Sequence, residues 1–168
     1  SAPTPETSRL PFTVEQINAL WAIQTEPWVD TVLIYIYTGF RLMELLTMKT
    51  TQVDLEQKTL RGGIKTAAGK DRLVPIHPRI LPLIQERMRN NDAYLFQIDG
   101  YEISSYRYHK RWREVMNKIG VQKTPHEARH TFETLLDNAN GNRKCIDLLM
   151  GHKSPDIGNR TYNHKTLE

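Results

Sequence analysis

The sequence contains only one cysteine, Cys145, and no long apolar run. A lone thiol cannot form a disulfide within its own chain, which fits a reducing cytoplasm, and its apolar neighbours predict a small buried hydrophobe rather than a reactive group. The longest apolar cluster covers residues 32–37 and is followed by Thr38 and Gly39. It is far shorter than the roughly 18 apolar residues that a membrane span needs. We therefore expect a cytoplasmic protein with no membrane partner.

Internal repeats and low-complexity tracts are also missing, and the composition is that of a globular protein. With 168 residues, of which 39% are hydrophobic and 25% charged, the chain has the size of one domain with one core. Its first residues are polar, include prolines and lack an initiator methionine. We interpret residues 1–11 as a linker or cloning remnant and residues 12–168 as one folded domain.

Basic residues outnumber acidic ones by 23 to 19, which gives a net charge of +4 and a pI near 9.2. This balance is compatible with a polyanionic partner, although many basic proteins bind no nucleic acid. Residues 106–113 interleave cations with aromatic side chains. Such a run, taken alone, is more often a solvated face than a phosphate track. We expect Tyr106, Tyr108 and Trp112 to pack within the protein rather than to stack on bases.

Apolar spacing and end signals predict a mainly helical chain. Thr13 and Gln16 form a capping-box pattern ahead of an amphipathic helix that extends to Ile23. Residues 27–38 predict a buried helix that Gly39 ends, and a short helix follows from Arg41. Thr124 is the expected cap of a later helix that starts at a proline. Further helices are expected over residues 78–90, 104–119, 125–139 and 142–150, with a short one around Tyr162.

The middle of the chain predicts a small antiparallel sheet. Residues 59–61, 62–66 and 72–76 are short extended pieces that are separated by glycine-containing turns. Lys65, Lys70 and Arg72 flank the second of these turns. The predicted architecture is therefore mainly α with a small antiparallel β-sheet, an α+β fold.

Residues 126–130 spell His-Glu-Ala-Arg-His, which matches the zinc-peptidase pattern H-E-x-x-H. On a helix the two histidines share a face and could bind zinc while Glu127 acts on a bound water. The extended metzincin pattern fails because Glu133 and Leu136 stand where glycine and histidine are required. A downstream carboxylate such as Asp147 is the remaining candidate for a third ligand. Arg129 would raise the cost of binding a divalent cation nearby. We therefore expect no metal, and zinc peptidase is a remote alternative.

Several motifs occur together in a fixed order along the chain. Residues 38–45 read Thr-Gly-Phe-Arg-Leu-Met-Glu-Leu, and residues 126–132 read His-Glu-Ala-Arg-His-Thr-Phe. Residues 149–152 read Leu-Met-Gly-His, and Tyr162 follows within residues 160–164. In this order, around a lysine-bearing hairpin, they resemble the tyrosine recombinases, the phage-type and transposon-type integrases. The resemblance covers most of the chain and implies the catalytic-domain fold of that family.

The chemistry of these residue types supports the same grouping. Transfer of a DNA phosphodiester needs a nucleophile, cations around the non-bridging oxygens and an acid for the leaving 5′-oxygen. Arg41 and Arg129 offer planar forks that match phosphate oxygens and keep their charge. His126 and His152 can add hydrogen bonds or move protons near neutral pH. A tyrosine phenol, with a reference pKa of about 10, needs cations nearby to lose its proton.

The resemblance implies the remaining roles. Tyr162 would form a 3′-phosphotyrosyl link that a second 5′-hydroxyl religates, with no cofactor. Lys65 would be the general acid, with Lys70 as its rival. Glu44 would orient a cation or cap a backbone group, and His130 would support the helix or contact a phosphate.

The resemblance also implies the partners and the source of the protein. We expect double-stranded DNA as the substrate and a homotetramer on DNA for the full-length protein, with this fragment a monomer. We also expect a mobile element in a bacterial cytoplasm as the source, a C-terminal docking segment that is missing or truncated, and an absent N-terminal DNA-clamping domain. Two alternatives share the fold: a type IB topoisomerase-like enzyme, and a DNA-binding module without catalysis.

Overall fold

The computed structural model of the protein describes residues 10–63, 72–139 and 141–150. The helices are α1 (Val14–Ala22), α2 (Val29–Thr38), α3 (Leu42–Leu46), α4 (Leu81–Met88), α5 (Ser105–Ile119), α6 (Pro125–Asn138) and α7 (Arg143–Met150), with a 3-10 turn η1 (Thr50–Gln52). The strands are β1 (Val53–Asp54), β2 (Thr59–Gly62), β3 (Arg72–Pro75), β4 (Gln97–Ile98) and β5 (Tyr101–Glu102). The mainly helical α+β architecture is the one that the sequence predicts.

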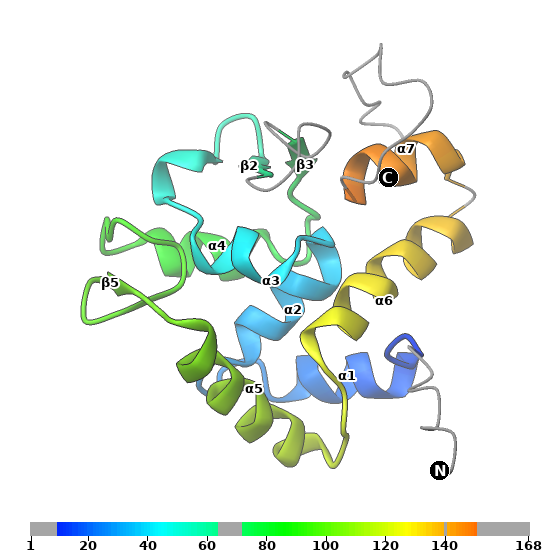
Figure 1. Ribbon diagram of the computed structural model, residues 1–168, viewed down its shortest axis with the longest axis horizontal. Helices are drawn as coiled ribbons and strands as arrows, with labels where there is room; N and C mark the ends of the chain where they lie inside the picture. Colours follow the sequence, from blue (N-terminus) through cyan, green and yellow to red (C-terminus); the bar gives the residue numbers. More distant parts are fainter. Residues whose placement is uncertain (1–9, 64–71, 140, 151–168) are drawn as a thin grey trace, which may run out of the picture.

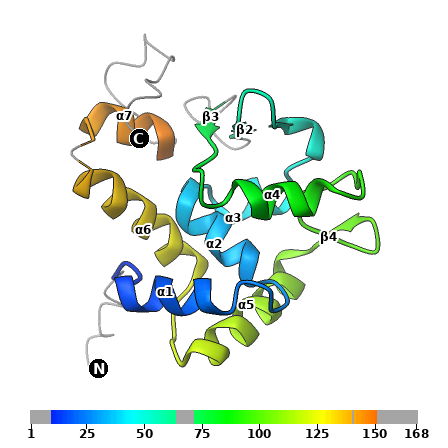
Figure 2. The same cartoon turned by 180° about the vertical axis from the view of Figure 1, so that it is seen from behind.

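Helix α2 forms the centre of the molecule. Its sequence is rich in apolar residues, and most of its side chains are fully buried, as expected for a helix that is enclosed by other elements. It packs against α6, α1 and α4, which surround it in both views (Figures 1 and 2). Helices α1, α4 and α6 are therefore positioned against α2.

Aromatic side chains join α5 to this central helix. Tyr108 and Trp112 on α5 lie with their ring centroids 5.9 and 6.0 Å from that of Tyr35 on α2. The hydroxyl groups of Tyr108 and Thr31 are 2.8 Å apart and hydrogen-bonded in the core, so the buried phenol keeps a polar partner. The packing expectation is confirmed for Tyr108 and Trp112 but wrong for Tyr106, which is 74% exposed on the outer face of α5.

Strands β1, β2 and β3 form an antiparallel sheet in that order. Leu60 opposes Val74 and both are buried, while Gly62 opposes Arg72 at the last described pair before the connection over residues 64–71. The strands expected near residues 59–61 and 72–76 are confirmed. The β4–β5 hairpin and β1 were not predicted, because two-residue strands show no alternation. Helix α7 packs on β3 and α6 (Figure 2).

Helix boundaries follow the capping chemistry. The Thr13 side chain accepts a hydrogen bond from the Gln16 backbone at 3.1 Å, and the Gln16 side chain accepts one from the Thr13 backbone at 2.9 Å, so the predicted capping box is confirmed. Helix α2 starts two residues later than expected because Trp28 has a left-handed φ of 67°. Helix α4 likewise starts at Leu81, after a turn over residues 78–80.

Among the described residues, no helix combines the length and the apolar character that crossing a membrane would require.

Replacing Leu33, a fully buried side chain of α2, with alanine should lower the free energy of unfolding by about 2–5 kcal/mol, because the cavity cannot close fully. The matched control is Leu10→Ala, since Leu10 is 58% exposed and its loss should cost less than about 0.5 kcal/mol. Urea unfolding followed by circular dichroism measures both. Equal losses for the two variants would contradict the central position of α2.

Candidate functional site

Arg41 is positioned by the sharp end of α2. The Gly39 backbone has φ of 67°, and its N–H donates to the Tyr35 carbonyl at 3.0 Å, which ends the helix. The chain then turns so that Arg41 becomes the extended N-cap residue of α3. The buried Tyr35 hydroxyl donates to the Leu42 carbonyl at 2.9 Å. The start of α3, and with it the Arg41 backbone, is thus tied directly to the core.

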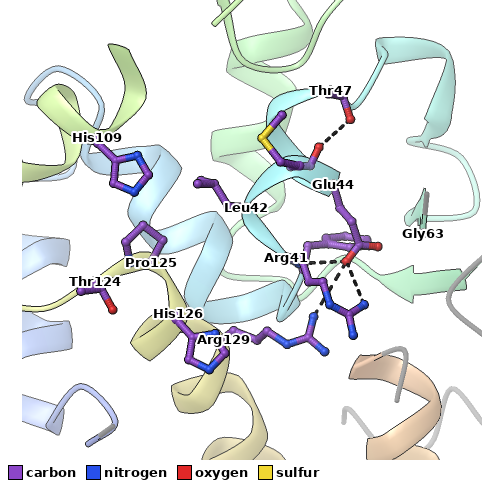
Figure 3. Close-up of a pocket in the computed structure, with 12 residues that line it drawn as sticks. Arg41, Leu42, Glu44, Thr47, Gly63, His109, Thr124, Pro125, His126 and Arg129 are labelled. Atoms are coloured by element: carbon purple, nitrogen blue, oxygen red, sulfur yellow. Dashed lines mark hydrogen bonds and ion pairs between the residues drawn. The ribbon is translucent and has the colours of Figure 1, made fainter. Parts of the chain in front are cut away.

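The Glu44 carboxylate is the hub of the site. It is 3% exposed, and Oε1 accepts a hydrogen bond from the Arg41 backbone N–H at 2.9 Å. Nη2 of Arg72 donates to Oε1 and Oε2 at 2.9 and 3.0 Å. Nη1 of Arg129 and Nη1 of Arg41 lie 3.8 and 3.9 Å from Oε1. Figure 3 shows the guanidinium groups of Arg41 and Arg129, from separate segments, converging on this one carboxylate.

The site carries more positive charge than its carboxylate neutralises. Burial, together with the charge of Arg41, lowers the pKa of Arg72 to about 10, although Glu44 acts in the opposite direction. Burial also lowers the pKa of Arg129 to about 9, helped by Arg41 and Arg72. Arginine still keeps its proton at neutral pH. Since each charge is held at an energetic cost, an anion that entered between the guanidinium groups would be stabilised.

A cavity of about 600 Å³ opens beside this cluster. Arg41, His126 and Arg129 line its polar side, and Leu42 and Pro125 contribute to an apolar wall (Figure 3). His126 and Arg129 project from the same face of α6, three residues apart, and His126 is exposed. The fold therefore brings the three described members of the predicted catalytic set to one cavity, from segments that are far apart in the sequence.

The helix that carries the H-E-x-x-H pattern uses its glutamate to cap itself. Oε1 of Glu127 accepts a hydrogen bond from the Thr124 backbone N–H at 2.9 Å, and Oε2 lies 3.4 Å from Nζ of Lys123. Within residues 10–63, 72–139 and 141–147, no group of three or more His, Cys, Asp or Glu side chains could hold a metal ion. Asp147, the candidate third zinc ligand, pairs with Arg143 at 3.5 Å. His130 is half-buried on α6 and does not line the cavity.

Four predicted residues lie outside the described part of the chain. Lys65 and Lys70 belong to the connection over residues 64–71, and His152 and Tyr162 belong to residues 151–168. Their roles remain predictions.

Arg72 and His109 are site residues that the sequence reasoning missed. The sequence places Arg72 only on the basic flank of a turn, yet it is 6% exposed and in contact with Glu44. The alternation of β3 carried the signal, because Arg72 and the buried Val74 share one face of the strand. His109 lines the cavity, and its Nδ1 lies 2.7 Å from the Ser105 carbonyl, so that hydrogen bond orients the ring.

Residues 11–168 match the sequence profile of the phage integrase family. The chain belongs to that family. The recognition of a tyrosine recombinase from the ordered motifs is thereby confirmed. The chain is 34% identical to the tyrosine recombinase XerA of Pyrococcus furiosus over 73% of its own length and 45% of that protein. It is 24% identical to the tyrosine recombinase XerC of Chlamydia trachomatis over 94% of its length and 55% of that protein. The chain thus spans about half the length of these relatives.

Solved structures show the same fold. The crystal structure of XerA recombinase superposes with a TM-score of 0.76 at 24% identity, covering 94% of this chain and 62% of that one. The integrase of the transposon Tn1549, in complex with circular intermediate DNA, gives a TM-score of 0.74 at 24% identity over 93% of this chain and 61% of that one. The predicted catalytic-domain fold of this integrase family member is therefore confirmed.

Inorganic phosphate should stabilise the protein by binding at the arginine cluster. At a phosphate concentration ten times the dissociation constant, the gain in unfolding free energy is about 1.4 kcal/mol. Arg41→Gln should lose most of that gain, since Arg41 lines the cavity. Arg89→Gln, which removes the same charge from an exposed pair with Glu86 on the surface, should retain it. Thermal unfolding in phosphate and in chloride of matched ionic strength measures the gain, and equal gains for both variants would contradict the site.

Proposed function

We propose that this chain is the catalytic domain of a site-specific DNA recombinase, which cleaves and religates double-stranded DNA through Tyr162. The observation that carries the proposal is the convergence of Arg41 and Arg129 on one carboxylate beside a cavity that His126 also lines. Two guanidinium groups and an imidazole at one opening suit a phosphodiester better than they suit any neutral substrate. Membership of the phage integrase family supports the same reaction class.

In each step of the proposed reaction, one phosphoester bond forms as another breaks. The Tyr162 oxygen attacks phosphorus, its phenolic proton leaves, and the bond from phosphorus to the 5′-oxygen breaks. The products are a 3′-phosphotyrosyl link and a 5′-hydroxyl that has taken up a proton. A 5′-hydroxyl from a second strand then attacks the link, which rejoins DNA and restores the tyrosine. No nucleotide hydrolysis is needed because the bond energy stays in the link, and we propose no cofactor.

Arg41 and Arg129 are proposed to hold the non-bridging oxygens in the transition state. Their guanidinium groups approach from different elements, the N-cap of α3 and the middle of α6. Both are preorganised by packing around Glu44, so little reorganisation accompanies the development of charge on the phosphate. Loss of one such donor costs a factor of about 10² to 10³ in rate.

The remaining roles are proposed from the family resemblance. Lys65 protonates the leaving 5′-oxygen, with Lys70 as the rival candidate. His126 and His152 donate hydrogen bonds to the phosphate or move protons. Glu44 and His130 support these groups, and the described contacts of Glu44 agree with an orienting role.

The proposed partner is double-stranded DNA. One relative of the same fold, the XerH recombinase, has been solved bound to its difH substrate, and it superposes with a TM-score of 0.69 at 20% identity. The Tn1549 integrase has likewise been solved in complex with circular intermediate DNA. We propose a tetramer on DNA for the full-length protein and a monomer for this fragment. A bacterial mobile element is the proposed source, and the cytoplasm the proposed location.

The outer face of α5 is a proposed contact for the DNA backbone. Arg107, Lys110 and Arg113 line a shallow surface depression with the exposed Tyr106. The Lys110 ammonium lies 5.7 Å from the centre of the Tyr106 ring. Cations gathered along one helix face supply the sequence-independent, salt-sensitive part of DNA affinity.

A covalent adduct on a suicide duplex tests the proposed reaction. The protein should yield a band of lower mobility on a denaturing gel in EDTA when the duplex carries a nick near the cleavage site, which traps the link. Tyr162→Phe should yield none, because the phenol oxygen is the nucleophile. Arg129→Lys should form adduct about 10² to 10³ times more slowly, since a lysine cannot present the planar fork.

Duplexes that carry the ends of the parent element are the appropriate substrates. Binding is confirmed first by fluorescence anisotropy. Absence of adduct from the unsubstituted protein on a bound duplex would contradict the proposal and favour a non-catalytic DNA-binding module. Relaxation of supercoiled DNA without a specific site would favour the topoisomerase-like alternative.

Lys110→Gln should reduce the slope of log affinity for DNA against log salt by about one, with a similar effect on all sequences, because one phosphate contact is lost. Lys118→Gln on the same helix is the matched control, since Lys118 pairs with Glu26 at 3.4 Å and its removal should leave the slope unchanged. Anisotropy titrations from low to moderate salt measure both slopes. A slope that Lys110→Gln does not alter would remove α5 from the DNA interface.

A further inference from the structure

Arg72 is buried more deeply than a surface ion pair requires. Its side chain is 4% exposed, and its guanidinium carbon lies 4.7 Å from the centre of the Phe40 ring. A side chain at Gly62, the residue opposite Arg72 in the sheet, would clash with that ring, because a Cβ there would lie 2.3 Å from Cε1 of Phe40. The backbone of β2, the ring and the guanidinium group are therefore packed in contact. Arg72 consequently has no open path to a ligand in the cavity, and it does not line that cavity.

The three guanidinium groups do not share Glu44 equally. Of these three groups, only the guanidinium of Arg72 is within hydrogen-bond distance of the carboxylate, at 2.9 and 3.0 Å. The guanidinium nitrogens of Arg129 and Arg41 lie nearly 1 Å farther away, at 3.8 and 3.9 Å. A buried carboxylate forms its strongest interaction with a charged donor at hydrogen-bond distance. Arg72 is thus the principal ionic partner of Glu44, while the other two guanidinium groups border the cavity.

We propose that Arg72 is a positioning residue that occupies the Glu44 carboxylate and thereby keeps Glu44 from drawing Arg41 and Arg129 away from the cavity. This inference rests on the proposed function of the same site. Without Arg72, the buried carboxylate would lack its main partner, and a small shift would bring the other guanidinium groups into hydrogen-bond distance. An incoming phosphate would then have to displace Glu44 before it could bind. Arg72 acts through Glu44 and does not touch the substrate.

The affinity for inorganic phosphate tests this role without requiring catalysis. Arg72→Met should raise the apparent Kd for phosphate by about 10- to 100-fold, the equivalent of one charge-assisted hydrogen bond that phosphate must displace. Adding Glu44→Gln to Arg72→Met should restore most of that affinity, because a neutral amide no longer attracts Arg41 and Arg129. A role confined to holding the fold together predicts no recovery in the double variant. Titration of the thermal unfolding midpoint with phosphate measures each Kd.

Arg87→Met is the matched control. Arg87 forms a comparable, partly buried pair with Asp30 at 2.5 and 3.0 Å, and it also stacks on a ring, that of Trp28, at 4.7 Å. It does not line the cavity. Its loss should lower stability and leave the Kd for phosphate within about twofold, as expected of a site with no shared partner. If Arg72→Met does not fold, Arg72→Gln removes the same charge and serves for the same comparison.

The outcomes separate this inference from the proposed function. An unchanged Kd in a folded Arg72 variant, or a double variant that binds no better than Arg72→Met, would overturn the positioning role. The covalent adduct assay, made on the unsubstituted protein, would be unaffected by that result. Conversely, phosphate binding could depend on Arg72 while the unsubstituted protein forms no adduct. That result would support the positioning role and contradict only the strand-transfer proposal.

Discussion

One buried carboxylate, Glu44, sets the arrangement of the whole site. It accepts a hydrogen bond from the Arg41 backbone and two from the Arg72 side chain. The guanidinium groups of Arg41 and Arg129 also lie within 4 Å of it. It therefore joins α3, β3 and α6 at one point. A single negative charge cannot neutralise three positive ones, and the burial of the group limits screening by water. The excess positive charge faces the cavity, so the cavity favours binding of an anion.

The rigid core makes this arrangement possible. The aromatic packing of Tyr35 with Tyr108 and Trp112 fixes the end of α2, and the Tyr35 hydroxyl extends that order to the first residue of α3. Burial strongly raises the pKa of Tyr35, which therefore keeps its proton and remains a donor at any physiological pH. Site residues at the ends of buried helices are held more firmly than residues on loops, and electrostatic preorganisation depends on such firmness.

Much of the fold could be predicted from local signals. The capping box at Thr13, the glycine stop after α2 and the proline-led start of α6 each have a local physical cause, and all are present. The predicted start of α2 is wrong because the left-handed backbone at Trp28 depends on tertiary packing. The ordered motifs were enough to group Arg41, His126 and Arg129 in one predicted site. The alternation of β3 indicated only that Arg72 is buried. Its partner Glu44 lies 28 residues away, and no local pattern reveals that contact.

Arg41 and Arg129 should share one DNA phosphate while Arg72 stays on Glu44, and a crystal structure of the Tyr162→Phe variant with an uncut duplex would test this arrangement. We predict one phosphate within hydrogen-bond distance of both guanidinium groups. The phenyl ring introduced at position 162 should face that phosphate opposite the 5′-oxygen, and the Arg72–Glu44 contact should be intact. A phosphate held by Arg72 itself, or two different phosphates bound by Arg41 and Arg129, would contradict the proposed site.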